Sequence, residues 1–115
     1  MKRGNKRKFG RKRNQRNALA KSLATALIDH GRITTTRAKA KTLSTYADKL
    51  VTQAKRQNLA SRRILAQTLG PKAVKKLVDE IAPKFKERNG GYTRVINLDR
   101  RISDGSPMAL IEFVS

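Results

Sequence analysis

Residues 23–55 read LATALIDHGRITTTRAKAKTLSTYADKLVTQAK, and this stretch carries the clearest signals of the fold. Its first part continues a pattern that begins four residues earlier, in which Leu19, Leu23 and Leu27 recur at helical spacing. Gly31 directly follows that pattern, where a glycine commonly ends a helix. The sequence therefore predicts one helix that ends near residue 30, followed by a sharp change of backbone direction.

The middle of the same stretch predicts a strand and a second helix. Residues 32–35 are short and rich in β-branched side chains, which is typical of a strand or an extended link. A threonine at 34–36 can then cap a helix that runs from about residue 37 to 56. Such a helix is on the order of 30 Å long at about 1.5 Å per residue. Its expected apolar stripe consists of Leu43, Ala47, Leu50, Val51 and Ala54.

Two further helices are expected downstream. Residues 58–69 predict a third, weaker helix, and Gly70-Pro71 separates it from a fourth, because proline is favoured at a first helical position. Pro83 is expected to stop the fourth helix. The residues expected to point inward are Ile64, Leu65 and Leu69 in the third helix and Val74, Leu77, Val78 and Ile81 in the fourth.

The period changes after Gly90-Gly91. Residues 92–98 and 108–114 have strand composition, and the turn cluster at 104–107 precedes the second of them. We expect an antiparallel hairpin with a long loop, to which residues 32–35 add a third strand. The predicted fold class is α+β: about four helices packed on a small antiparallel or mixed sheet, forming a single domain over residues 14–115.

The first residues form a separate, strongly basic segment. Residues 1–16 contain no acid and, after Met1, one large apolar side chain, Phe9, so they cannot bury enough surface to fold alone. We expect residues 1–13 to be an extended RNA-binding arm that orders on its partner, with Asn14 or Asn17 capping the first helix. A mitochondrial transit peptide is the alternative, although the chain from residue 19 onward fits the fold. The nine cations are Lys2, Arg3, Lys6, Arg7, Lys8, Arg11, Lys12, Arg13 and Arg16.

Net charge narrows the classes of partner. The 115 residues include 28 Lys and Arg against 8 Asp and Glu, a net charge of +20 that repels itself in a compact domain. A polyanion is therefore expected nearby: nucleic acid, an anionic membrane or an acidic protein. The chain has no cysteine, which excludes disulfides and thiolate metal sites. No apolar run approaches the roughly 20 residues that span a bilayer.

The side chains that usually carry catalysis are sparse. His30 is the only histidine, and its place at a predicted helix end suits a capping or RNA-facing role. Asp79 and Glu80 are adjacent, so they point about 100° apart on a helix and more plausibly balance Lys75, Lys76 and Lys84. Gly90-Gly91 matches no phosphate-binding fingerprint. We expect no enzyme, no metal and no cofactor.

The binding signals point to RNA. Lysines and arginines that neutralise phosphates release counterions, and Arg side chains also stack on bases. Solvated polar faces are the alternative for the body residues, and a packed strand position is the alternative for Tyr92, which could otherwise stack on a base. Beyond the nine cations of the arm, the candidates are Arg32, Arg37, Lys39, Lys41, Arg62, Arg63, Arg88, Tyr92 and Arg94, with Arg100 and Arg101 as further cations.

Three stretches resemble the bacterial large-subunit ribosomal protein L17 family: residues 23–55, ERNGGYTRV at 87–95 and SPMALIEFV at 106–114. Their order and spacing also match, and the similarity covers nearly all of residues 11–115. The resemblance implies helices against a small sheet, binding to large-subunit ribosomal RNA, a place near the polypeptide exit and contacts with neighbouring ribosomal proteins. It implies a cytoplasmic location on the ribosome. It implies no membrane and no small-molecule substrate as partner.

This chain departs from the family pattern at two places. Residues 99–104 read DRRISD where the family usually has glycines, which leaves the conformation of that loop open. Gln15-Arg16 stands where the family often has His-Arg.

Two other functions compete with a ribosomal role: a free nucleic-acid binder, such as a nucleoid protein or RNA chaperone, and a membrane-active cationic peptide. The last needs an exposed amphipathic helix that the arm does not provide.

Overall fold

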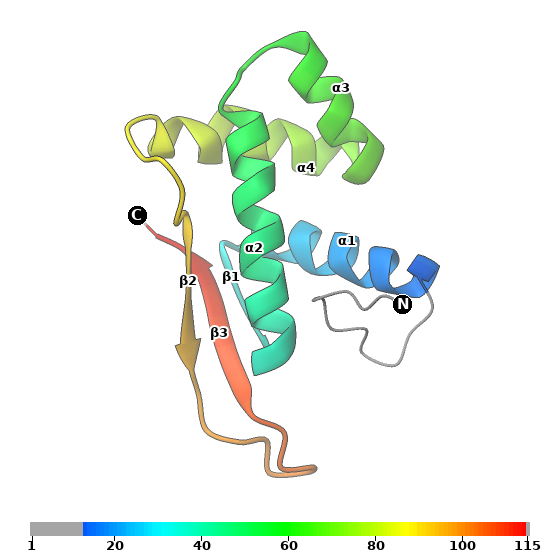
Figure 1. Cartoon of the computed structure of the whole chain (residues 1–115), viewed down its shortest axis with the longest axis vertical. Helices are drawn as coiled ribbons and strands as arrows, with labels where there is room; N and C mark the ends of the chain where they lie inside the picture. Colours follow the sequence, from blue (N-terminus) through cyan, green and yellow to red (C-terminus); the bar gives the residue numbers. More distant parts are fainter. Residues whose placement is uncertain (1–12, 115) are drawn as a thin grey trace, which may run out of the picture.

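The computed structural model describes residues 13–114, in which one long helix lies along a small sheet and the other helices pack around that helix (Figure 1). The sheet has three antiparallel strands in the order β1-β3-β2. Helix α2 is the centre of the fold, since it contacts all three strands, α1, α3 and the turns that follow α4. The elements are α1 (Arg13–His30), β1 (Arg32–Thr36), α2 (Arg37–Ala54), α3 (Leu59–Thr68), α4 (Pro71–Lys76), η1 (Leu77–Ile81), η2 (Ala82–Phe85), β2 (Thr93–Asn97) and β3 (Met108–Phe113).

The unit α1–β1–α2 follows the signals in its sequence. Gly31 adopts φ +80, and its N–H donates to Leu27 O at 2.7 Å, which ends α1 in the left-handed conformation that glycine favours. Thr36 caps α2, its side chain accepting from the backbone N–H of Lys39 at 3.4 Å. The predicted glycine stop, threonine cap and third strand are confirmed. The predicted capping of α1 is wrong, because Asn14 and Asn17 both lie inside the helix.

The core is built from small and branched side chains on α2. Ala40, Ala47 and Ala54 are fully or almost fully buried, and their small size lets the sheet and neighbouring helices approach the α2 backbone closely. Leu43 and Val51 complete the buried face, so the predicted stripe is confirmed except that Leu50 packs at its edge and is only partly buried. The opposing sheet residues are Ala109 and Ile111.

Helix α3 turns a different face inward than predicted. Leu65 and Leu69 are buried as expected, but Ile64 is 50% exposed, so its assignment to the core is wrong. Ser61 is buried instead, one turn before Leu65, and hydrogen bonds with Gln53 of α2 at 3.2 Å. The inward face of this short helix therefore combines buried leucine with a polar contact to α2.

The fourth helix changes its winding and does not stop at Pro83. It runs as α4, then as the π-helical turn η1, then as the 3₁₀ turn η2, which contains Pro83 near its start. Proline has no N–H to donate and is tolerated in a first turn, so helical winding can resume around it. The extra turns carry Phe85 into the core, where its ring lies 5.2 Å from that of Tyr92.

The hairpin has the predicted antiparallel pairing, with Val95 opposite Ile111. The loop between β2 and β3 closes on itself: Arg101 N donates to Ser106 O at 2.8 Å, and Ser106 N donates to the Asp104 carboxylate at 3.0 Å. That second contact lowers the pKa of Asp104. Gly105, at φ +71, completes the turn by donating to Arg101 O at 2.8 Å, and the loop leaves Ile102 fully exposed.

Candidate nucleic-acid interface

A groove between α1 and α2 gathers more of the predicted cations than any other described feature. Its rim carries Arg13 and Arg16 from α1 and Lys39, Lys41 and Lys49 from α2, and no acidic residue lines it within residues 13–114. The spacing explains the α2 side, because positions 39, 42, 46 and 49 fall on one helical face. We call this feature the α1–α2 groove; its volume is about 570 Å³.

The floor of the α1–α2 groove is apolar. It is formed by Leu19 and Leu23 of α1 and by Leu43 and Tyr46 of α2, of which Leu43 belongs to the core. Burial raises the pKa of Tyr46, while a hydrogen bond with the side chain of Thr68 on α3 works in the opposite direction. The Tyr46 side chain is partly buried and packs against the core, so it joins the groove lining to the interior.

Among the described residues, the groove cations have no internal partner, whereas seven other cations do. Within residues 13–114, none of the five rim side chains makes a hydrogen bond or ion pair. Their charge is therefore free to meet an anion from outside, without first breaking an internal contact. By contrast, internal acceptors are bound by the side chains of Lys55, Arg62, Lys76, Arg88, Arg94, Arg100 and Arg101.

Arg37, the first residue of α2, is placed differently from the groove lysines. Its backbone N–H donates to Pro107 O at 2.9 Å and joins the helix start to the hairpin loop. Its side-chain Nε is buried, with no hydrogen-bond partner among the described residues. A buried guanidinium N–H without an acceptor is costly, so this side chain would gain from a partner that the free chain does not supply.

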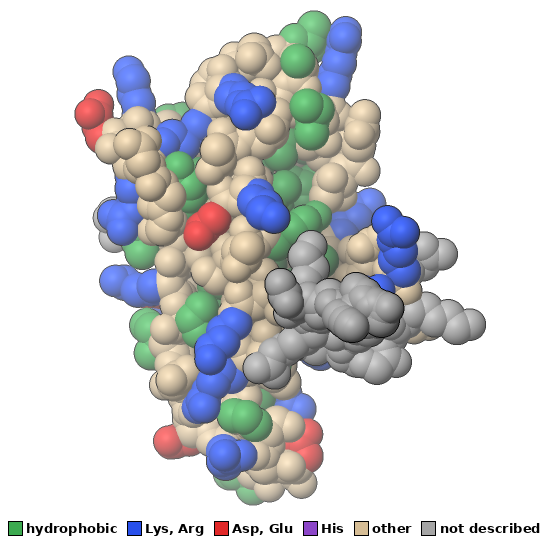
Figure 2. All heavy atoms as spheres, viewed as in Figure 1, with side chains coloured by type: hydrophobic (Ala, Val, Ile, Leu, Met, Phe, Trp, Pro, Cys, Tyr) green, Lys and Arg blue, Asp and Glu red, His purple; other side chains and the backbone are tan. Residues whose placement is uncertain are grey.

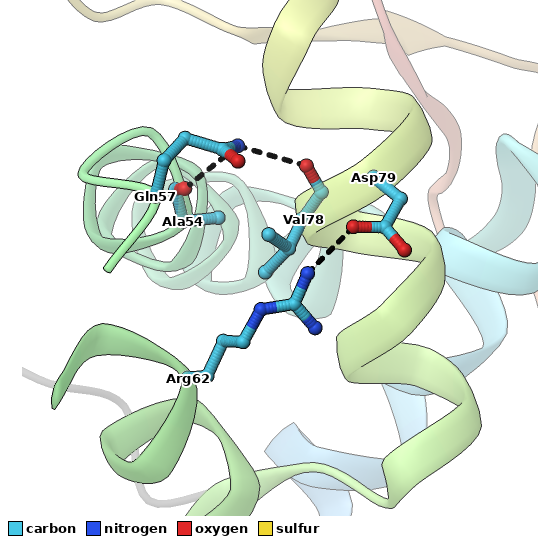
Figure 3. A network of polar contacts seen from close by, with 5 residues as sticks. All are labelled: Ala54, Gln57, Arg62, Val78 and Asp79. Atoms are coloured by element: carbon cyan, nitrogen blue, oxygen red, sulfur yellow. Dashed lines mark hydrogen bonds and ion pairs between the residues drawn. The ribbon is translucent and has the colours of Figure 1, made fainter. Parts of the chain in front are cut away.

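Two predicted RNA-binding arginines are engaged in ion pairs. Arg62 on α3 contacts Asp79 on η1 at 2.6 Å, beside the Gln57 amide, which donates to Ala54 O and Val78 O (Figure 3). This contact replaces the predicted balance of Asp79 by lysines on its own helix. Arg94 contacts Glu112 across the β2–β3 pair, also at 2.6 Å.

The remaining predicted arginines of the body are dispersed. Arg32 on β1 stands opposite Glu112 in the register, so it shares the outer sheet row with Arg94. Arg63 is exposed on α3, away from the groove lining. The space-filling view likewise shows lysine and arginine side chains spread over α2, α3 and the hairpin, with few acids between them (Figure 2).

Tyr92 occupies a packed position. It is 2% exposed, its ring meets Phe85, and its hydroxyl accepts a hydrogen bond from Lys55 Nζ at 3.1 Å. Burial alone raises the pKa of Tyr92, but the hydrogen bonds and the charge of Lys55 outweigh it and leave the pKa lowered. Lys55 also donates to the Arg88 carbonyl, and the Arg88 side chain donates to Gly91 O at 3.0 Å. This geometry favours the packed interpretation of Tyr92 over base stacking.

The other cations predicted to bind RNA, between Lys2 and Lys12, lie outside the described residues. Within the part of the chain that the structure describes, no cluster of histidine and acidic side chains could hold a metal ion. No described helix is both long and apolar enough to cross a bilayer. His30 is exposed in the last turn of α1, which is compatible with either role considered for it.

Sequence reasoning missed Tyr46 and Lys49 as parts of the basic face. Both lie on the helical stripe that contains Lys39, so the 39–42–46–49 spacing was the available signal. The apolar pattern of α2 identifies only the face of the helix that points into the core. The residues beside that face, such as Tyr46 and Lys49, do not indicate which other helix will pack against them.

Comparison with known proteins agrees with this architecture. Residues 19–114 match the family model described as ribosomal protein L17. Three similar proteins are each named large ribosomal subunit protein bL17. The one from Sulfurihydrogenibium sp. (strain YO3AOP1) is 55% identical over 108 residues, covering 92% of this chain and 89% of the relative. Those from Thermoanaerobacter sp. (strain X514) and Thermus thermophilus are each 49% identical, over 94% of this chain and 97% and 93% of the relative, respectively. With a family match across most of its length and relatives of this identity, the chain belongs to the ribosomal protein L17 family, a family of structural proteins of the large ribosomal subunit.

Proposed function

We propose that this protein binds large-subunit ribosomal RNA, with the α1–α2 groove and the basic arm as its main contacts. The observation that carries the proposal is the set of five rim cations without an internal partner or an acid in the groove, within the described residues. Such side chains attract phosphates at no internal cost and release counterions on contact. The arm continues the same charge from the N-terminal end of α1.

The location of the protein in the subunit is a further part of the proposal. The L17 resemblance supports a site on the subunit surface near the polypeptide exit, beside other ribosomal proteins, in the cytoplasm. The role is structural: the folded body presents a shaped cationic face, and RNA offsets the self-repulsion of a chain with a net charge of +20.

A salt-wash cosedimentation experiment with stoichiometry tests the proposal. Full-length tagged protein, expressed at the level of the native chain, should sediment with large subunits at one copy each and stay bound through a high-salt wash. A nucleoid protein or RNA chaperone would instead be removed by salt in proportion to its phosphate contacts. Sub-stoichiometric, salt-labile association would refute the ribosomal role. Cross-linking of the protein to RNA within the subunit tests the location, and cross-links confined to RNA far from the polypeptide exit would refute it.

A further inference from the structure

The α1–α2 groove combines two properties that phosphate binding alone does not require. Its rim is cationic, but its floor is apolar and includes an aromatic ring, Tyr46. A site for phosphates only is expected to be polar throughout, since an apolar floor offers nothing to a phosphate. The pairing of positive rim and aromatic floor is typical of proteins that bind single-stranded nucleic acid, where bases stack on aromatic side chains along a charged groove.

The dimensions and rigidity of the groove fit one small occupant. Its volume of about 570 Å³ lies in the roughly 300–1,000 Å³ range of small-molecule sites. Tyr46 is partly buried and packs against the core, and Leu43, which also lines the groove, is buried within that core. A floor fixed in this way can receive a flat ring without first having to order itself.

We propose that the α1–α2 groove takes an unpaired RNA nucleotide, with its base packed against Tyr46 and its flanking phosphates contacted by the rim cations. The inference rests on the proposed RNA-binding function and goes beyond it by naming the element recognised. A base inside a double helix is stacked between its neighbours, so only a splayed-out nucleotide from a loop, bulge or end can enter. An apolar peptide would match the floor but leave five cations without a partner, which is why we favour a nucleotide over a protein segment.

The chain offers a direct spectroscopic test. It has no tryptophan and two tyrosines, and Tyr92 is 2% exposed, so a ligand that quenches tyrosine emission reports on Tyr46. We expect a short oligoadenylate to bind the full chain and quench this emission. Tyr46→Leu should bind oligoadenylate about 5- to 140-fold more weakly, the range that corresponds to loss of one base–aromatic stack. Its affinity for a blunt RNA duplex with the same number of phosphates should not change.

Two further variants separate stacking from folding. Tyr46→Phe keeps the aromatic ring, so it should bind oligoadenylate like the wild type. Ala20→Leu leaves Tyr46 intact but places extra side-chain volume in the groove from α1, so it should reproduce the selective loss even if Tyr46→Leu fails to fold.

The outcomes distinguish this inference from the function it rests on. If Tyr46→Leu and Ala20→Leu bind oligoadenylate as tightly as the wild type, or lose duplex binding equally, no base enters the groove. Oligoadenylate binding without quenching of tyrosine emission would also overturn the inference. So would the finding that, in the large subunit, a neighbouring protein rather than RNA occupies the groove. A wild-type chain that binds neither RNA would contradict the proposed function itself.

Discussion

Replacing three groove lysines by glutamine, Lys39→Gln, Lys41→Gln and Lys49→Gln, should weaken RNA binding without weakening the fold. Each lysine that engages one phosphate contributes about 0.7–0.9 to the slope of log K against log salt. The triple variant should therefore be less salt-dependent by about 2.1–2.7. At about 0.1 M salt, one decade below a 1 M reference, this corresponds to a loss of roughly 100- to 500-fold in affinity.

The same change should leave the fold intact or slightly more stable. Lys39 lies in the first turn of α2, which contains no acid, so its charge opposes the helix dipole. Removing that charge should stabilise the helix by about 0.3–1 kcal/mol. Loss of binding together with an unchanged or raised melting temperature would identify lysines that serve a ligand rather than the fold.

A matched triple variant provides the control. Arg62→Gln, Arg94→Gln and Arg101→Gln remove the same number of charges, but each of these arginines is already paired with a carboxylate. Fluorescence anisotropy titrations of a labelled ribosomal RNA fragment at several salt concentrations measure both slopes. We expect the control to change the slope of log K against log salt by less than about 0.7, the contribution of one phosphate contact. If the two triple variants lower the slope equally, net charge alone governs binding and the argument from the groove is refuted.

Three other changes test the arm, the cap and the core. Deleting residues 1–12 removes seven of the basic residues but no residue of the described core, so incorporation into large subunits in competition with wild-type protein should fall while the melting temperature holds; normal incorporation would show that the arm is not a main anchor. Thr36→Ala removes the cap of α2 and should cost about 0.5–2 kcal/mol in urea unfolding, with Thr34→Ala, on the same strand, as the neutral control. Phe85→Ala should cost about 3–5 kcal/mol, because the ring is buried between Tyr92 and Phe113; a cost below about 1 kcal/mol would mean that this corner does not pack as described.

Local signals predicted the elements that depend on few residues. Gly31 ends α1 because the chain there needs a positive φ, and Thr36 starts α2 because a side-chain oxygen can accept from the first turn. The hairpin followed from alternation and a turn cluster. The third strand required one non-local step, the pairing of residues 32–36 with β3, which the shortness of the α1–α2 connection made plausible.

The errors arose where tertiary contacts overrule local preference. The inward face of α3 includes Ser61, which contacts Gln53 of α2, and no periodicity in a ten-residue helix reveals such a contact. Pro83 lies within the 3₁₀ turn η2 and does not stop the winding, which continues to Phe85, a residue of the core. The turn after α2 places Gln57 at φ 56, and its side-chain amide donates to Ala54 O of α2 and Val78 O of η1. This role depends on how α2 and η1 lie together, which the local sequence does not reveal.

The α1–α2 groove could be predicted only in part for the same reason. Four of its five cations were candidates from the sequence, since a dense basic start and a basic helix N-terminus are visible without a structure. Tyr46 and Lys49 were not, because their role depends on how α1 lies against α2. Composition identifies a polycation, but the packing of two helices decides which of its charges share one concave surface.

The placement of the acids indicates how the protein would approach RNA. Asp48 accepts hydrogen bonds from the Tyr92 backbone and the Thr93 hydroxyl, which ties α2 to β2. Three further carboxylates, on η1, the hairpin loop and β3, pair with arginines, and no acid lines the groove within the described residues. These four acids make their contacts away from the groove, whose five cations have no internal partner within the described residues. The net charge of +20 attracts a polyanion, and the α1–α2 groove offers it cations with no acid beside them among the described residues, so phosphates should be drawn to the groove before any base is contacted.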